Sequence, residues 1–157
     1  MLVRMGIKNF ALIEHMQLEF AKGITIFTGE TGSGKSILMD AFSILLGERA
    51  SSEFIRHEKD SFLIEGVFDI AGDTALQELL VNKNILVEED TLILSRTFNR
   101  NGKSQILAND QVIPLKALRE IGTYLADIHG QYSNQQLLLP DTHHIYLDTY
   151  NDRSEER

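Results

Sequence analysis

The chain has 157 residues, and its 15 Lys and Arg against 23 Asp and Glu give a formal net charge of −8 at pH 7. A chain of this length buries enough surface to fold without a disulfide or a structural metal, and the lack of cysteine excludes thiolate zinc sites, iron–sulfur clusters and cysteine nucleophiles. The acidic balance argues against a protein that coats nucleic acid through bulk charge, and no apolar run approaches the roughly 20 residues that cross a bilayer.

The first third of the chain is predicted to run from strands through a glycine-rich loop into a helix. Short strands are predicted at 2–7, 16–20 and 24–27. The segment 28–34 contains three glycines in six residues and is predicted to be a loop. After the loop, a stripe of apolar residues at helical spacing predicts a helix. Gly47 is placed to end this helix with a left-handed cap. The members of the stripe are Ile37, Leu38, Ala41, Ile44 and Leu45.

The second part is predicted to alternate strands and helices. Strands are predicted at 62–70, 91–98 and 104–108, and helices at 74–81 and 115–126. Asn101-Gly102 supplies the positive φ for a tight turn between the last two strands, and Pro114 suits a first helical turn. The tail from Thr142 has helical spacing and ends in charged residues without a cap or stop signal. We expect from this ending that the chain is a fragment cut within an element.

The segment Gly29-Glu30-Thr31-Gly32-Ser33-Gly34-Lys35-Ser36 fits the phosphate-loop pattern G-x-x-x-x-G-K-[ST] at every fixed position. Glycines let successive backbone N–H groups converge on an anion, and the following helix presents its positive N-terminal end to the same anion. Lys35 adds a positive charge for the β- and γ-phosphates, and Ser36 offers a hydroxyl to Mg²⁺. The predicted strand before the loop and the helix after it supply the required context, so these eight residues are predicted to bind a nucleotide.

A phosphate loop alone does not hydrolyse a nucleotide, because phosphoryl transfer also needs a second Mg²⁺ ligand and a group that places the attacking water. The usual second ligand is an Asp that ends an apolar strand. Gly66-Val67-Phe68-Asp69 imitates this pattern but contains a glycine and lacks a following Glu. We therefore interpret Asp69 as the end of a strand.

Five segments resemble the N-terminal part of the RecN family of bacterial DNA repair proteins, which belongs with the structural-maintenance-of-chromosomes (SMC) ATPases. They are Ile7-Lys8-Asn9-Phe10-Ala11-Leu12-Ile13-Glu14, Thr28 to Ser36, Leu46-Gly47-Glu48-Arg49-Ala50, Ile55-Arg56-His57 and Asp127-Ile128-His129-Gly130-Gln131. The resemblance implies an α/β P-loop NTPase fold: the N-terminal lobe of an ABC/SMC-type head, with a mixed sheet and an antiparallel hairpin subdomain. It assigns 1–140 to this lobe and 141–157 to a helical lead-in to a coiled coil that the chain lacks.

The resemblance also implies a function and partners. In such families two heads enclose two ATP molecules, and each phosphate loop is completed by the signature motif of the opposite head. We therefore expect the ATP-binding half of a head that acts in DNA double-strand break repair and recombination. Hydrolysis would require the C-terminal lobe and a second head, as a homodimer, so that the chain alone binds ATP and Mg²⁺ without turnover. Binding of DNA by the full-length protein, a cytoplasmic location with the bacterial nucleoid and no membrane association are implied as well.

The same resemblance assigns roles to individual residues. Lys35 and Gln131 would be catalytic, and Ser36 and Gln131 would bind Mg²⁺, with Gln131 as the Q-loop glutamine. On the residues alone, Gln131 is one of several glutamines in a polar segment, and solvation explains it. Arg56 resembles the arginine that related heads place near the phosphates or DNA, and a solvated loop arginine is an equal alternative.

Two further groups carry weaker signals. The predicted hairpin carries three basic residues and one aromatic residue: Arg96, Arg100, Lys103 and Phe98. This cluster indicates either a small phosphate-contacting patch or a charged hairpin tip that resists edge pairing. We prefer the second interpretation. His129, His143 and His144 lack a carboxylate at metal-binding spacing and are interpreted as structural or surface residues.

Two other functions remain open on the sequence. A complete small nucleotide kinase also opens with a phosphate loop, but it needs an arginine-rich lid and a second-substrate pocket, and neither is evident. A nucleotide-gated interaction module without turnover is the non-enzymatic alternative.

Overall fold

The computed structural model describes residues 1–28 and 34–128. Residues Met1–Ala126 form one compact unit, and the chain from Asp127 onward forms another, of which only Asp127 and Ile128 are described. The predicted boundary at residue 140, the helical lead-in at 141–157 and the three histidines His129, His143 and His144 lie outside the described residues.

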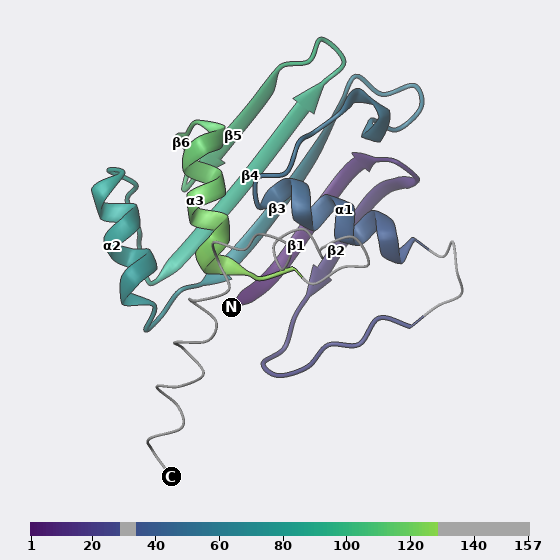
Figure 1. The fold of residues 1–157 in the computed structure, drawn as a ribbon. Coiled ribbons are helices and arrows are strands. Elements are labelled where there is room, and N and C mark those ends of the chain that lie inside the picture. Colours follow the sequence, from purple (N-terminus) through teal and green to yellow (C-terminus); the bar gives the residue numbers. More distant parts are fainter. Residues whose placement is uncertain (29–33, 129–157) are drawn as a thin grey trace, which may run out of the picture. The chain divides into compact units, whose positions relative to one another are not determined.

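The first unit is built on a six-stranded sheet with helices on one face (Figure 1). The strands are β1 (Leu2–Phe10), β2 (Ile13–Glu19), β3 (Ser61–Asp69), β4 (Thr91–Asn99), β5 (Ser104–Ala108) and β6 (Gln111–Val112). The helices are α1 (Lys35–Leu45), α2 (Thr74–Asn82) and α3 (Leu115–Leu125), with a short 3-10 turn at Ser52–Phe54. The strand order is β2-β1-β3-β4-β5-β6, and every described pairing is antiparallel. The predicted antiparallel hairpin, β4 with β5, is thus part of a sheet whose described pairings all run antiparallel.

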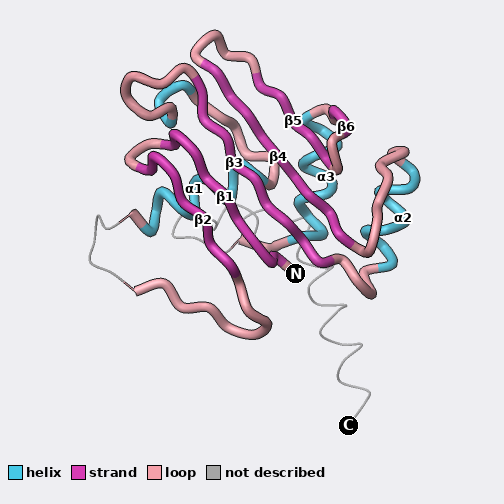
Figure 2. The backbone as a smooth tube through the Cα atoms, turned by 180° about the vertical axis from the view of Figure 1, so that it is seen from behind, coloured by secondary structure: helices cyan, strands magenta, loops and turns pink. Residues whose placement is uncertain are grey.

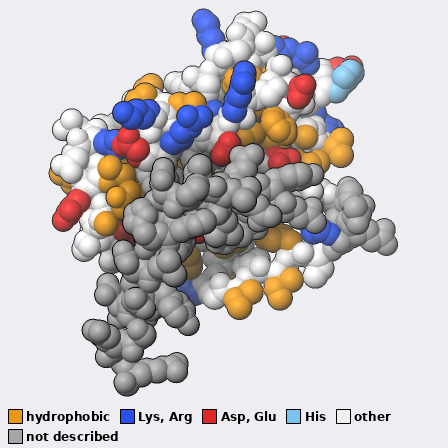
Figure 3. Space-filling model, viewed as in Figure 1, with side chains coloured by type: hydrophobic (Ala, Val, Ile, Leu, Met, Phe, Trp, Pro, Cys, Tyr) orange, Lys and Arg blue, Asp and Glu red, His pale blue; other side chains and the backbone are white. Residues whose placement is uncertain are grey.

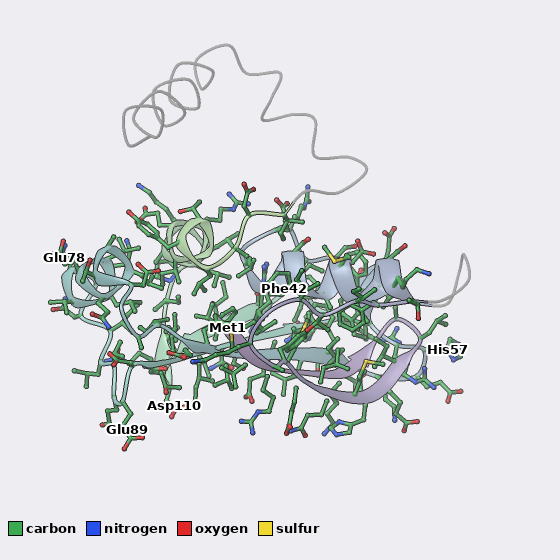
Figure 4. The ribbon with its side chains drawn as sticks, turned by 90° about the horizontal axis from the view of Figure 1, so that it is seen from below. Met1, Phe42, His57, Glu78, Glu89 and Asp110 are labelled. Carbon is green, nitrogen blue, oxygen red and sulfur yellow. The ribbon has the colours of Figure 1, made fainter. Side chains whose placement is uncertain are left out.

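Buried and partly exposed residues alternate along the central strands, and this alternation determines which face of the sheet the helices cover. In β3, Phe62, Ile64, Gly66 and Phe68 are buried, and the residues between them are partly exposed. Seen from behind, the strands lie in front of α1 and α3, and the view along the sheet shows both helices on the same side (Figures 2 and 4). The core therefore lies between this face of the sheet and the two helices.

A glycine in β3 sets how closely α1 approaches the sheet. A Cβ atom at Gly66 would lie 2.6 Å from Cδ2 of Leu45 and 2.9 Å from Cε2 of Phe68. The missing side chain thus makes room for Leu45, which is fully buried at the end of α1. Gly66 is a packing residue in this unit, and a strand with a side chain at this position would push the helix outward.

Most predicted elements are confirmed, including the hairpin of β4 and β5 and the three helices. Gly47 ends α1 as predicted, with a φ of +115° and a hydrogen bond from its N–H to the carbonyl of Ile44. The N–H of Glu48 bonds to the carbonyl of Ser43, which completes a Schellman-type cap.

The strand predicted at 24–27 is wrong, because the structure gives these residues no strand pairing. Ile24 is 91% exposed and Ile26 is 77% exposed, and Phe27 packs its ring 6.3 Å from that of Phe20. A strand is defined by its hydrogen-bonded neighbour, and no described strand lies beside this segment. The apolar pattern is present, but within the described residues it does not produce a strand.

Among the described residues, no helix combines the length and apolar character needed to cross a membrane.

Candidate nucleotide-binding site

Helix α1 begins at the end of the phosphate-loop motif. Gly34 is its N-cap residue, with a φ of +94° in the left-handed region, and a Cβ built there would meet no atom within 4 Å. The first turn is closed by a hydrogen bond from the N–H of Leu38 to the carbonyl of Gly34, 3.1 Å long. The site residues Lys35 and Ser36 are consequently the first two residues of the helix.

The first turn of α1 has the properties of an anion site. Within residues 1–28 and 34–128 no side chain caps this turn, and the turn contains no acidic residue. A helix N-terminus presents N–H groups without intrahelical partners and a partial positive charge to an incoming anion. With an ammonium group at Lys35 and an exposed hydroxyl at Ser36, the turn fits the phosphates and Mg²⁺ of a bound nucleotide.

The remaining predicted site residues cannot be placed in this way. Gly29, Glu30, Thr31, Gly32 and Ser33 lie outside the described residues, and so does Gln131. Their predicted contacts with phosphate and Mg²⁺ stay predictions. The described part of the site is therefore Gly34, Lys35 and Ser36.

Helix α1 is fixed to the unit along its inner side and at its C-terminal end. Ala41, Ile44 and Leu45 are buried against the sheet, whereas Met39 is 47% exposed. These hydrophobic contacts fix one side of α1 against the sheet. Because Lys35 and Ser36 are the first residues of this helix, the core also determines their position.

Asp69 is a turn residue in this structure, in agreement with its interpretation as a strand end. Its Oδ1 accepts a hydrogen bond of 3.0 Å from the N–H of Ala71, and its backbone carbonyl accepts one from the N-terminal amino group of Met1. Its backbone N–H donates to the carbonyl of Met1. These contacts tie the end of β3 to the start of β1.

Arg56 joins two loops. Its Nη1 donates a hydrogen bond of 2.7 Å to the carbonyl of Leu12 in the turn between β1 and β2, and its N–H donates to the carbonyl of Asn9. Ala11 in the same turn donates its N–H to the carbonyl of Phe54. Arg56 thus has a defined structural contact that sequence reasoning missed, and its role toward phosphate or DNA stays a prediction.

The basic hairpin patch needs a correction. Arg96 is only 2% exposed, beneath α1 and not at the hairpin tip, and Phe98 stacks on Phe62 with ring centroids 5.8 Å apart. Arg100 and Lys103 do lie at the exposed tip, where Nε of Arg100 donates to the carbonyl of Lys59. The four residues therefore do not form one surface. Lys and Arg side chains are nevertheless frequent in the upper half of the face shown in Figure 3.

Comparison with sequence families gives a match over nearly the whole chain. Residues 4–152 match the family described as "AAA domain". The chain is 41% identical over 147 residues to the DNA repair protein RecN of Bacillus subtilis, covering 94% of this chain and 25% of that protein. It is 37% identical over 150 residues to RecN of Vibrio cholerae, covering 96% of this chain and 27% of that protein. The chain thus spans about a quarter of the length of these relatives.

Solved structures show the same fold at low sequence identity. A structure from work on ATP-driven dimerization and DNA-stimulated activation of SMC ATPases matches with a TM-score of 0.67 and 18% identity, covering 94% of this chain and 97% of that one. The SMC head domain of Thermotoga maritima matches with a TM-score of 0.56 and 24% identity, covering 76% of this chain and 41% of that one. The predicted fold, a P-loop ATPase lobe of ABC/SMC type, is confirmed.

Proposed function

Because the chain belongs to the AAA domain family and is similar over nearly its whole length to RecN proteins, we propose that it is the ATP-binding lobe of an SMC-like ATPase head that acts in DNA repair. The proposal includes Mg²⁺ as the companion of ATP. It further assigns hydrolysis to a complete head, formed with a complementary lobe and a second head.

One observation carries the proposal: the phosphate-loop motif ends at the N-terminus of a docked helix. Gly34 caps α1 in a left-handed conformation, so that Lys35 and Ser36 occupy the first turn. A motif match alone is modest support, whereas this junction of loop and helix is what binding of a polyphosphate requires.

The exposed segment 24–27 supports the need for a complementary lobe. Ile24 and Ile26 are large apolar side chains that the described residues leave exposed, in a sequence that favours a strand. Apolar residues clustered at the surface mark a site of association. We infer that a strand of the complementary lobe pairs here, directly before the phosphate loop.

The roles of the remaining site residues follow from the same proposal. Gln131 would ligate Mg²⁺ or orient the attacking water through its amide oxygen, and its NH₂ group would act as a donor. Lys35 would stabilise the charge that develops on the β- and γ-phosphates. Because this set lacks the carboxylate that usually completes the Mg²⁺ site, we expect the chain alone to bind ATP with negligible turnover.

Reconstitution tests the proposal directly. ATP hydrolysis is measured for the chain alone, for a complementary C-terminal lobe of a RecN protein alone, and for the two mixed or joined by a short linker that replaces the coiled coil. We expect turnover only in the pair, and loss of that turnover in Lys35→Ala. Steady-state hydrolysis by the pure chain, or no hydrolysis by a well-folded pair, would contradict the proposal.

Two additional measurements separate this proposal from the alternatives. A screen of phosphate acceptors detects a nucleotide kinase, which would transfer the γ-phosphate to a second substrate. Light scattering with and without ATP, followed by DNA binding over a salt series, detects association, and association without turnover in the reconstituted pair would identify an interaction module. Association with a second head and with DNA are parts of the proposal that these measurements address. The proposal also includes a location at the bacterial nucleoid.

A further inference from the structure

Two arginines hold the C-terminal end of α1. Nη1 of Arg96, on β4, donates hydrogen bonds to the carbonyls of Ile44 at 2.5 Å and Glu48 at 2.6 Å. Nε of Arg119, on α3, donates to the carbonyl of Gly47 at 3.0 Å. The end of a helix carries carbonyl groups without intrahelical partners and a partial negative charge, so cationic donors stabilise it.

Arg96 holds this position from inside the core. It is 2% exposed and is the single charged side chain that is buried among the described residues. On the sheet it pairs with Ile64 of β3 and Ile106 of β5, so apolar residues flank it on both neighbouring strands. Burial, and then the positive charge of Arg119, lower the pKa of Arg96, whereas Glu48 raises it.

A buried guanidinium is an unfavourable way to fill this space. Its Nε has no hydrogen-bond partner within the described part of the chain, and a buried donor without a partner destabilises the folded state. An apolar side chain of similar volume fills a comparable site at equal or lower free energy. The hydrogen bonds to the carbonyls of Ile44, in the last turn of α1, and Glu48, in the segment just after the helix, are therefore what distinguishes Arg96 from a packing residue.

The contact between α1 and α3 is too close to allow side chains on its glycines. A Cβ at Gly122 would lie 2.3 Å from the carbonyl oxygen of Leu46, and a Cβ at Gly47 would lie 2.7 Å from Cγ of Arg119. The end of α1 is consequently held by β4 below and by α3 beside it. Arg119 is exposed, so water competes for its contact, whereas Arg96 is shielded.

We propose that Arg96 is a positioning residue for the nucleotide site: by fixing the C-terminal end of α1 it sets the place of Lys35 and Ser36 at the other end. The inference rests on the proposed function. Helix α1 has 11 residues and is therefore about 16 Å long. A hydrogen-bonded helix moves as a unit, so a shift at one end displaces the other. A displacement of about 1 Å in a reacting group can cost roughly a hundredfold in rate.

The test compares Arg96→Met, Arg96→Lys and the control Ile106→Val. Arg96→Met keeps the volume and removes the two hydrogen bonds, and Arg96→Lys keeps a charge that can replace part of them. Ile106→Val loosens the same layer of the core but leaves Arg96 and its two hydrogen bonds in place, so we expect a modest loss of stability. Each folded variant is titrated with ATP and Mg²⁺, its stability is measured in urea, and hydrogen exchange is followed at the N–H of Leu38.

We expect Arg96→Met to weaken binding of ATP and Mg²⁺ about tenfold, the size of one lost hydrogen bond to a charged phosphate, and to speed exchange at Leu38 N–H. Arg96→Lys should restore part of the ATP affinity and part of the protection from exchange at Leu38. Ile106→Val should change neither the affinity nor the exchange rate, although it lowers stability. Two results would overturn the inference. In the first, the affinity for ATP falls in proportion to the stability in urea in all three variants. In the second, folded Arg96→Met binds ATP as tightly as the unsubstituted chain.

Hydrogen exchange separates this inference from the proposed function. If the unsubstituted chain shows no binding of ATP, the proposed function is wrong, and the exchange rate at Leu38 still tests the mechanical link. An unchanged rate in both Arg96 variants then overturns the positioning role by itself.

Discussion

Replacing Gly66 tests the contact that seats α1 on the sheet. In Gly66→Ala the new Cβ would lie 2.6 Å from Cδ2 of Leu45 and 2.9 Å from Cε2 of Phe68. Carbon atoms pack at about 3.5–4.0 Å, so the leucine or the helix must move by about 1 Å. Overpacking of this kind costs about 1–3 kcal/mol, and we expect a corresponding drop in the free energy of unfolding.

Gly6 is the matched control, because it also lies in a strand of the same sheet. A Cβ at Gly6 would meet no atom within 4 Å, and its φ is not positive. In Gly6→Ala the unfolded chain loses conformational freedom without a clash, so we expect equal stability or a gain of up to about 1 kcal/mol. The two substitutions are chemically identical and differ only in what the added methyl group meets.

Urea unfolding followed by circular dichroism measures both variants, and the shift of the midpoint gives the change in stability when the slope is unchanged. Leu45→Ala extends the test to a double-mutant cycle. Removal of Leu45 costs about 2–5 kcal/mol by itself, but it also removes the atom that the new Cβ meets. The double variant should therefore lose less than the two single variants together. Equal midpoints for Gly66→Ala and Gly6→Ala, or strict additivity in the cycle, would refute the reasoning.

Substitutions at three further positions test other parts of the unit. Gly47→Ala places a side chain at a φ of +115° against Arg119, and we expect thermal unfolding to show a loss of about 1–3 kcal/mol; an unchanged midpoint would argue against the close contact. A hydrogen bond from Lys83 lowers the pKa of Glu120, so this pair stabilises the fold at neutral pH and ceases to do so as the pH falls through the lowered pKa. Glu120→Gln should melt below the unsubstituted chain at neutral pH and low salt, and the two curves should converge in acid. Asp73 accepts a hydrogen bond from the N–H of Leu76 at the start of α2, and Asp73→Ala should lose about 1 kcal/mol in urea, whereas Asp73→Asn should retain most of it.

The periodic elements could be predicted from the sequence because local patterns determine them. The alternation of Phe62, Ile64 and Phe68 places one face of β3 in the core, as the structure shows. Gly47 after an apolar stripe indicated the end of α1, because a left-handed C-terminal cap needs a positive φ, which glycine adopts without strain. In each case the signal lies within a few residues of the element.

The features that sequence reasoning missed depend on distant contacts. Arg96 follows Leu92 and Leu94 at a spacing of two, so the strand period already placed it on the buried face, but its charge suggested the hairpin surface instead. The carbonyls that satisfy it belong to residues about 50 positions earlier, and no local pattern shows them. Likewise, Ile24 and Ile26 have the composition of a strand, but pairing depends on a neighbour that the pattern cannot reveal.

The binding of ATP and Mg²⁺ by the folded chain tests the central claim most directly, by isothermal titration calorimetry. We compare the unsubstituted chain with Lys35→Ala and with Lys103→Ala, which removes the same charge from the exposed hairpin tip. A hydrogen bond to a charged group contributes about 1.5–3 kcal/mol, so Lys35→Ala should bind at least about tenfold more weakly, and Lys103→Ala should match the unsubstituted chain. If properly folded protein gives no heat with ATP or GTP in excess magnesium, or if Lys35→Ala binds as tightly as the control, the claim is contradicted.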